Sequence, residues 1–258
     1  MCGIFGVVNK EINKNKFDSS LNLLSHRGPD NINKSYFEKF ALGHTRLSIQ
    51  DLSQTGNQPM FDDQKNCIIY NGEIYNFKIL REKLKQRNNT FYTQTDTEVI
   101  LKSISNYGLQ ESLKLFRGMF SFAYFNKKEN KIFLVRDKYG MKPLYYTSNP
   151  KYGFIFSSEV KPINSFINQL ELDRKQLVIS SFLGLHSYPF TNFKNIFEVK
   201  PGEILIYDLN SDKISSKNFF SLDQFIDEDY FNHLNSLNEK NILIEYDKHF
   251  SNAVKTHL

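Results

Sequence analysis

Apolar positions along the chain recur with two different spacings, one typical of strands and one of helices. Short or alternating apolar runs predict a strand directly at the amino terminus, another just before Gly43, and several more further on. Their expected positions are residues 3–8, 67–70, 119–125, 132–135, 144–147, 153–156 and 203–207. The pairs Asn71-Gly72 and Pro201-Gly202 are typical of turns next to such strands.

Apolar side chains spaced three or four residues apart predict helices between these strands. Residues 17–24 and 77–87 each place such side chains on one helical face. A further helix begins at a capping box, where Glu98 follows Thr95 by three residues, and ends at Gly108. Two more helices are expected at 174–183 and 242–258. Strands and helices mixed without strict alternation predict an α+β layered domain.

The composition changes after Leu209, where Ser, Asn, Asp and Lys dominate as far as about residue 240. Such a polar stretch has too few apolar side chains to form a packed core. We therefore expect one domain over residues 2–210 and a linker after it.

The chain has 258 residues, of which 40% are apolar and 24% are charged, as in ordinary globular proteins. A net charge of +5 would suit a nucleic-acid ligand, but Lys and Arg are scattered and form no run of five. Two cysteines cannot build a disulfide framework, and no Cys and His have the spacing of zinc ligands. Nothing has the pattern of a signal peptide or a membrane span. We expect a cytoplasmic protein with no metal, no nucleic-acid partner and no membrane partner.

Cys2 is the first candidate for chemistry because of its position. If Met1 is removed, the thiol and a free α-amino group share one carbon atom. An α-amino group of pKa about 7.7–8.0 can act as a base near neutral pH, beside a thiol of pKa about 8.5. Nucleophile and base are then held together without a histidine. Gly3 is expected to leave room for a substrate next to the backbone.

Two other interpretations of Cys2 stay open. Most free cysteines are small buried hydrophobic residues, and Cys2 fits that description as well. A hydrolase of the papain kind would use His26 or His44 as the base. Papain-like enzymes carry their Cys inside the chain near the start of a helix, however, whereas Cys2 leads a strand. Hydrogen-bonded structural roles are therefore favoured for both histidines.

A series of short motifs follows Cys2 along the chain. They are MCGIFG at 1–6, SHRGPD at 25–30, GHTRLSI at 43–49, QPM at 58–60, YNGEIYN at 70–76, TDTE at 95–98, RGMF at 117–120, RDKYGMKPLYY at 136–146 and SSEVK at 157–161. In this order and spacing they resemble the class II (N-terminal nucleophile) glutamine amidotransferase domain of the asparagine synthetase B family. The resemblance covers about residues 2–210.

The resemblance implies a four-layer αββα fold, in which two antiparallel sheets lie between helices. It also implies that Cys2 attacks L-glutamine to form a thioester, which releases glutamate and ammonia. In a full-length or partnered synthetase the ammonia would serve asparagine synthesis from aspartate and ATP. No cofactor is expected for the glutaminase half, and ATP and Mg only with a synthetase domain.

The same resemblance assigns roles to residues in these motifs. Arg46 would hold the glutamine α-carboxylate, because a guanidinium binds both oxygens at once. Glu73 and Asp96 would bind the α-ammonium group. Asn71 and Gly72 would form the oxyanion hole through a side-chain amide and a backbone N–H. The pocket beside Arg46 would be lined, largely through backbone groups, by Leu47, Ser48, Ile49 and Gln50.

Each of these roles has a structural alternative. Arg46 would instead form a surface ion pair. Asn71-Gly72 would be an ordinary hairpin turn, which this pair makes readily. Asp96 would be a negative charge that stabilises the amino terminus of a helix through the macrodipole.

One family feature is absent from the sequence, the Ser-Gly-Gly-x-Asp-Ser loop that grips pyrophosphate in the synthetase domain. Residues 242–258 resemble the helix that precedes this loop, so 211–258 are expected to be a linker and the start of a truncated synthetase domain. L-glutamine is the expected substrate. The sequence leaves open whether the chain also binds a separate synthetase chain and whether it forms a homodimer. The rival function is a catalytically silent glutamine-binding or scaffold module.

Overall fold

Two antiparallel sheets of six strands each form the centre of the computed structural model, which describes residues 1–184 and 187–257. The first sheet has the order β10 (Phe197–Glu198), β8 (Tyr145–Asn149), β9 (Gly153–Ser157), β1 (Gly3–Val8), β3 (Phe40–Arg46) and β2 (Asn31–Tyr36). The second has the order β12 (Lys213–Asn218), β11 (Glu203–Asp208), β7 (Lys131–Arg136), β6 (Gly118–Asn126), β5 (Cys67–Ile74) and β4 (Met60–Phe61). The strand at the amino terminus therefore lies in the middle of its sheet.

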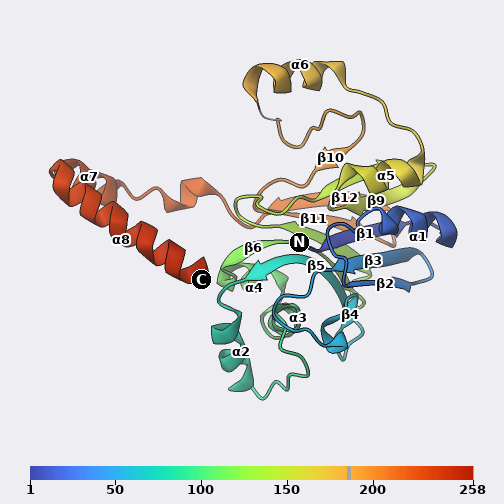
Figure 1. The fold of residues 1–258 in the computed structure, drawn as a ribbon, viewed down its shortest axis with the longest axis horizontal. Coiled ribbons are helices and arrows are strands. Elements are labelled where there is room, and N and C mark those ends of the chain that lie inside the picture. The colour runs from blue at the N-terminus through green and yellow to red at the C-terminus, as the bar shows by residue number, and fades with distance from the viewer. Residues whose placement is uncertain (185–186, 258) are drawn as a thin grey trace. The chain divides into compact units, whose positions relative to one another are not determined.

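Helices cover the outer face of each sheet (Figure 1). The first sheet is covered by α1 (Lys14–Asn22) and α5 (Val160–Ile167), and the second by α2 (Phe77–Lys85), α3 (Asp96–Tyr107) and α4 (Leu109–Leu115). A sixth helix, α6 (Arg174–Leu183), begins at the capping side chain of Asp173. The expected four-layer αββα fold is confirmed.

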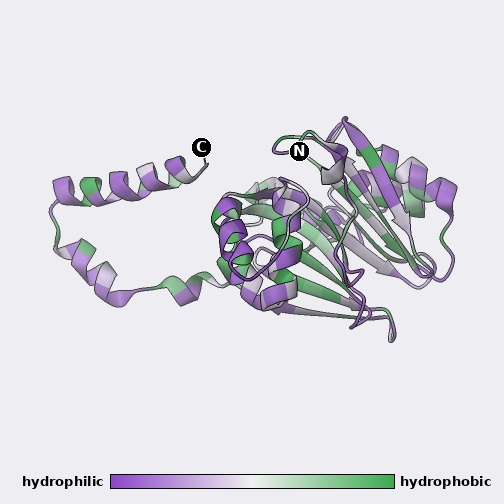
Figure 2. Ribbon diagram, turned by 90° about the horizontal axis from the view of Figure 1, so that it is seen from below, coloured by the Kyte–Doolittle hydropathy of each residue, from purple (hydrophilic) through white to green (hydrophobic). Residues whose placement is uncertain are grey.

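The central strands of each sheet are apolar on both faces, because the other sheet covers one face and helices cover the other. In β1, Ile4 and Val8 pack toward the second sheet, whereas Phe5 and Val7 pack against α1 and α5. In β5, Ile69 faces the first sheet, and its neighbours along the strand face the helices α2–α4. Successive side chains of a strand point to opposite faces, so a strand buried on both sides is a continuous apolar run. Figure 2 shows long green stretches in strands at the centre of the Met1–Phe219 unit, whereas its helices change between purple and green along their length.

The predicted turn at Asn71-Gly72 is wrong, because β5 continues through it as far as Ile74. Asn71 pairs with Ser121 of β6 and Gly72 pairs with Phe120. A Cβ atom on Gly72 would lie 2.3 Å from the carbonyl oxygen of Met119. The glycine is therefore required by the close approach of two strands and not by a turn.

The chain divides into two compact units, Met1–Phe219 and Phe220–Leu258. The strand β12 belongs to the first unit, although residues 211–218 were expected to be linker. All six side chains of β12 are exposed, so this edge strand carries no apolar alternation that the sequence could reveal.

The second unit holds the helices α7 (Glu228–Ser236) and α8 (Glu239–His257). Residue 258, the end of the predicted last helix, lies outside the described residues. No helix in the described ranges is long and apolar enough to cross a membrane.

Candidate active site

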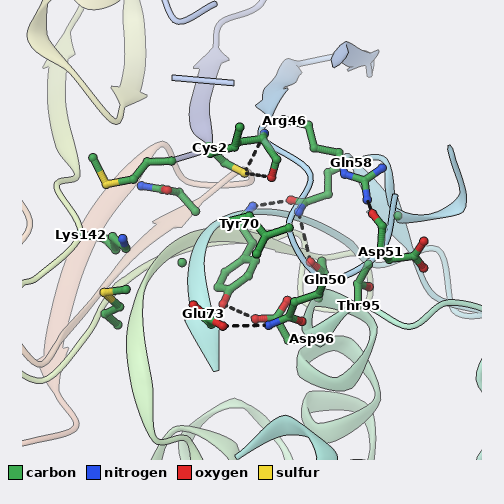
Figure 3. Close-up of a pocket in the computed structure, with 18 residues that line it drawn as sticks. Cys2, Arg46, Gln50, Asp51, Gln58, Tyr70, Glu73, Thr95, Asp96 and Lys142 are labelled. Atoms are coloured by element: carbon green, nitrogen blue, oxygen red, sulfur yellow. Dashed lines mark hydrogen bonds between the residues drawn. The ribbon is translucent and has the colours of Figure 1, made fainter. Parts of the chain in front are cut away.

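A cavity of about 330 Å³ opens next to Cys2, where several motifs far apart in the sequence meet. It is bounded by the end of β3, the loop after it, the middle of β5, the start of α3 and Met119 of β6 (Figure 3). Of the residues predicted for the site, only Ser48 does not line it. The Ser48 backbone N–H instead donates to Asp30 at 2.7 Å.

Cys2 is held by contacts on both its side chain and its backbone. The backbone N–H of Leu47 donates to the Cys2 sulfur at 3.5 Å, and the thiol lies 3.7 Å from the Leu47 carbonyl oxygen. Arg27 Nε donates to the Cys2 carbonyl at 3.0 Å, and Arg27 Nη1 pairs with Glu159 at 3.0 Å. The sequence motifs contained Arg27 and Glu159 but did not indicate that they fix the nucleophile.

The Cys2 thiol needs a base to become nucleophilic. Burial raises its pKa, and the Leu47 N–H opposes this shift only in part. Within the part of the chain that the structure describes, neither His26 nor His44 forms a hydrogen bond with the Cys2 sulfur. His44 Nε2 donates to the Tyr70 carbonyl at 3.0 Å, and burial lowers the His44 pKa to about 3. His26 Nε2 is engaged by Glu159 at 3.0 Å.

The expectation for Gly3 is wrong, because no space for a substrate lies beside it. A Cβ atom there would lie 2.6 Å from Thr45 Oγ1 and 2.9 Å from Leu24 Cβ. The chain itself fills this volume, so the glycine allows β1 to pack closely against β3 and the segment after α1.

Arg46 is buried, with 6% of its surface exposed, and forms no ion pair with any described residue, which excludes the surface ion pair. Its guanidinium donates to the carbonyl of Ser53 at 2.6 Å, to Asn57 Oδ1 at 2.9 Å and to the carbonyl of Asp51. A Cβ atom on Gly56 would lie 2.4 Å from Arg46 Nη2. Gly56 therefore leaves the space in which the loop wraps the guanidinium.

Two carboxylates lie at another corner of the cavity, those of Asp96 and Glu73. Asp96 Oδ2 accepts from the Tyr70 hydroxyl at 2.7 Å and from the Ile74 N–H at 2.9 Å. Burial nevertheless raises the Asp96 pKa to about 6, and the Glu73 charge adds to that shift. Asp96 is also the first residue of α3, so its position agrees with the helix-terminus interpretation as well.

The loop residues after Arg46 approach the cavity in different ways. Leu47 lines the cavity, and its backbone contacts the Cys2 sulfur. Gln50 instead uses its side chain, whose Nε2 donates to Glu73 Oε1 at 3.3 Å. Ile49 is 69% exposed at the cavity mouth.

Asn71 lines the cavity, and the residue is only 1% exposed. Neither its Nδ2 nor its Oδ1 finds a hydrogen-bond partner among the described residues. Leaving such a group unpaired costs roughly 1–3 kcal/mol, and a catalytic role is one of the explanations for such a group in native proteins. The amide is thus available to a ligand in the cavity.

Comparison with known proteins gives the family. The family model described as a glutamine amidotransferase domain matches residues 1–220. This chain belongs to the glutamine amidotransferase domain family. Within the part of this amidotransferase domain that the structure describes, no group of three or more His, Cys, Asp or Glu could hold a metal ion.

The amidotransferase domain is similar to proteins that are named asparagine synthetases. A Methanocaldococcus jannaschii protein of that name is 38% identical over 251 residues, covering 87% of this chain and 47% of the relative. Glutamine-hydrolysing asparagine synthetase 1 of Bacillus subtilis is 36% identical over 208 residues, covering 78% of this chain and 33% of the relative. The chain therefore spans a third to a half of the length of these curated relatives.

The fold of the amidotransferase domain also occurs in a solved structure of low sequence identity. Glutamine phosphoribosylpyrophosphate amidotransferase from Bacillus subtilis superposes with a TM-score of 0.65 at 20% identity. The match covers 85% of this chain and 49% of that one. At this identity the likeness establishes the shared architecture alone.

Proposed function

We propose that the chain hydrolyses L-glutamine to glutamate and ammonia through a thioester on Cys2. The observation that carries the proposal is the unpartnered, buried amide of Asn71 in the cavity beside the Cys2 thiol. Arg46 would bind the substrate α-carboxylate with the guanidinium hydrogens that the loop leaves free. Asp96 and Glu73 would bind the α-ammonium group, and the two ends of glutamine would thus be recognised by opposite charges.

In the proposed first step the Cys2 α-amino nitrogen, free after removal of Met1, takes the thiol proton. The sulfur attacks the side-chain carbonyl carbon, and the carbonyl oxygen becomes an oxyanion stabilised by Asn71 and the Gly72 N–H. The intermediate collapses, the α-ammonium gives its proton to the departing nitrogen, and ammonia leaves. Water then attacks the thioester, which yields glutamate and restores the thiol and the neutral amine.

The relatives support a proposal for the fate of the ammonia. Because they are named glutamine-hydrolysing asparagine synthetases, we propose that ammonia serves asparagine formation from aspartate and ATP on a synthetase domain or partner chain. The glutaminase half needs no cofactor in this scheme. Both thiols are free, so the reducing cytoplasm stays our prediction for the compartment.

A glutaminase assay tests the proposal against its rival, the silent glutamine-binding module. Purified protein whose intact mass shows loss of Met1 is expected to release ammonia from glutamine. Addition of a synthetase with aspartate, ATP and Mg²⁺ is expected to convert that ammonia into asparagine. Protein that binds glutamine in calorimetry but releases no ammonia, with or without the synthetase, would support the silent module instead.

Replacement of Arg46 by Lys is expected to raise KM for glutamine about 10–100-fold, because hydrogen bonds to a charged group are worth roughly 1.5–3 kcal/mol. Lys keeps the charge but cannot bind two carboxylate oxygens and the loop carbonyls together. The measurement is steady-state ammonia release against glutamine concentration. Arg174→Lys on the exposed start of α6 is the matched control and should change nothing. An unchanged KM in Arg46→Lys would remove Arg46 from the binding site.

Glutamine affinity is expected to fall as the pH drops below about 6, because Asp96 then takes up a proton. The raised pKa means that the ionised form, which the α-ammonium requires, dominates only above that value. Calorimetry on the Cys2→Ala variant between pH 5 and 8 should show Kd rising toward tenfold per pH unit on the acidic side. Asp96→Asn should bind more weakly and lose this dependence. A wild-type pH dependence in Asp96→Asn would assign the titration to another group.

A further inference from the structure

Lys142 is a buried cation in the same cavity that the proposed mechanism has not used. Its residue is 7% exposed and lines the cavity together with Cys2. Its ammonium group makes no hydrogen bond and no ion pair with any residue in the described ranges. Figure 3 shows Lys142 and Arg46 on different sides of Cys2. Burying a charged lysine without a partner costs free energy, so its place in the same cavity as a nucleophile needs an explanation.

The loop that carries Lys142 is built to hold it in place. Asp137, which is 1% exposed, accepts from the backbone N–H groups of Tyr139, Met141 and Lys142, each at 3.0 Å. Arg136 Nε donates to the Lys142 carbonyl at 2.9 Å. These bonds use the residues of the RDKYGMKP motif, and they fix the Lys142 backbone at the cavity wall.

The charges around the amino terminus indicate what a cation does there. The structure retains Met1, whose α-amine lies one residue before Cys2, and the charged groups that act on this Met1 amine are the Cys2 thiol, Arg27 and Lys142. Burial lowers the pKa of this amine most, the thiol opposes that shift, and Arg27 and Lys142 add to it. Burial lowers the pKa of Lys142 itself and Arg27 adds to that shift, whereas Asp137, Glu73 and Cys2 oppose it and favour the charged ammonium. A fixed positive charge disfavours a second positive charge nearby and favours a neutral amine.

We propose that the positive charge of Lys142 keeps the α-amino group of mature Cys2 in its neutral, proton-accepting form. The inference rests on the proposed function, since it concerns the base of that reaction. Lys142 acts through Cys2 and does not exchange a proton itself. When the amine takes the thiol proton, the same charge destabilises the new ammonium and assists transfer of its proton to the departing nitrogen.

The test compares wild type, Lys142→Met and Lys142→Arg after removal of Met1. Loss of the charge in Lys142→Met should shift the acidic limb of kcat/KM for glutamine upward by about half to one pH unit. Lys142→Arg keeps the charge and should retain the wild-type limb. Lys128→Met, in the exposed turn at the far end of β6, is the matched control and should leave the profile unchanged. Thermal unfolding checks that each variant is folded.

A second measurement separates this inference from the proposed function. The rate at which iodoacetamide alkylates Cys2 without glutamine reports the state of the thiol and amine at each pH. A shifted profile in Lys142→Met, with the wild-type profile in Lys142→Arg, supports the charge role even if wild type fails to hydrolyse glutamine, which would overturn only the proposed function. Identical profiles in wild type and Lys142→Met, or loss of hydrolysis in Lys142→Arg with its alkylation profile intact, would overturn the inference.

Discussion

Replacement of Cys2 by Ala is expected to abolish ammonia release from glutamine while leaving the fold and glutamine binding intact. The variant still exposes a small first residue after Met1 removal, so only the sulfur is lost. That sulfur makes two weak contacts with the Leu47 backbone, so its loss should change the free energy of unfolding little. Ammonia assays, calorimetry with glutamine and thermal unfolding measure the three properties separately.

Cys67→Ala is the matched control, because it removes the other thiol of the chain. Cys67 is fully buried between the two sheets, and burial raises its pKa far above the ordinary value. Its replacement should lower the free energy of unfolding by about 1 kcal/mol through the small cavity it leaves. Hydrolysis should remain. Ammonia release that survives in Cys2→Ala, or that disappears only in Cys67→Ala, would reject Cys2 as the nucleophile.

The strands and helices that could be predicted are those whose apolar spacing reports their packing. β1, which is buried on both faces, has the bounds that the sequence predicted. The bounds of α6 also match the prediction, although Gln176 is its one buried residue; the Asp173 cap marks where it begins. Edge strands gave no such signal, because β2 and β12 are largely polar and exposed. Their position is set by pairing with β3 and β11, which a local pattern cannot encode.

The two glycine predictions failed for a common reason. The sequence shows where a glycine is, but not whether a turn, a ligand or another strand requires it. At Gly72 the requirement is the backbone of β6, and at Gly3 it is the side chains of Thr45 and Leu24. Contacts between segments far apart in sequence decided both cases.

The sequence predicted which residues form the candidate site, but not the contacts that hold these residues in place. The motifs named Cys2, Arg46 and Asn71, and the structure brings all three to one cavity. The support behind them was missed: the Arg27 bond to Cys2, and the loop that presents Lys142. Both depend on which way a side chain points, which a single sequence does not contain.

Replacement of Asn71 by Leu is expected to lower kcat for glutamine by about 10²–10³, the usual cost of losing one oxyanion-hole donor. The same change should leave the melting temperature unchanged or raise it. Both polar atoms of the Asn71 amide are buried and unpartnered within the described chain, so an apolar side chain of similar volume removes an unpaired group. A catalytic residue is expected to raise activity at the expense of the free energy of unfolding. A merely structural asparagine would behave in the opposite way.

Asn66→Leu provides the contrast, because that asparagine is also buried but fully engaged. Its Nδ2 donates to Asp62 at 2.9 Å, and its Oδ1 accepts from the Lys127 N–H at 2.9 Å. Removing these bonds should lower the melting temperature and leave kcat near wild type. The two variants should therefore change activity and stability in opposite combinations, measured by ammonia release and thermal unfolding. If Asn71→Leu is destabilised like Asn66→Leu and keeps its kcat, Asn71 supports the fold and the oxyanion hole lies elsewhere.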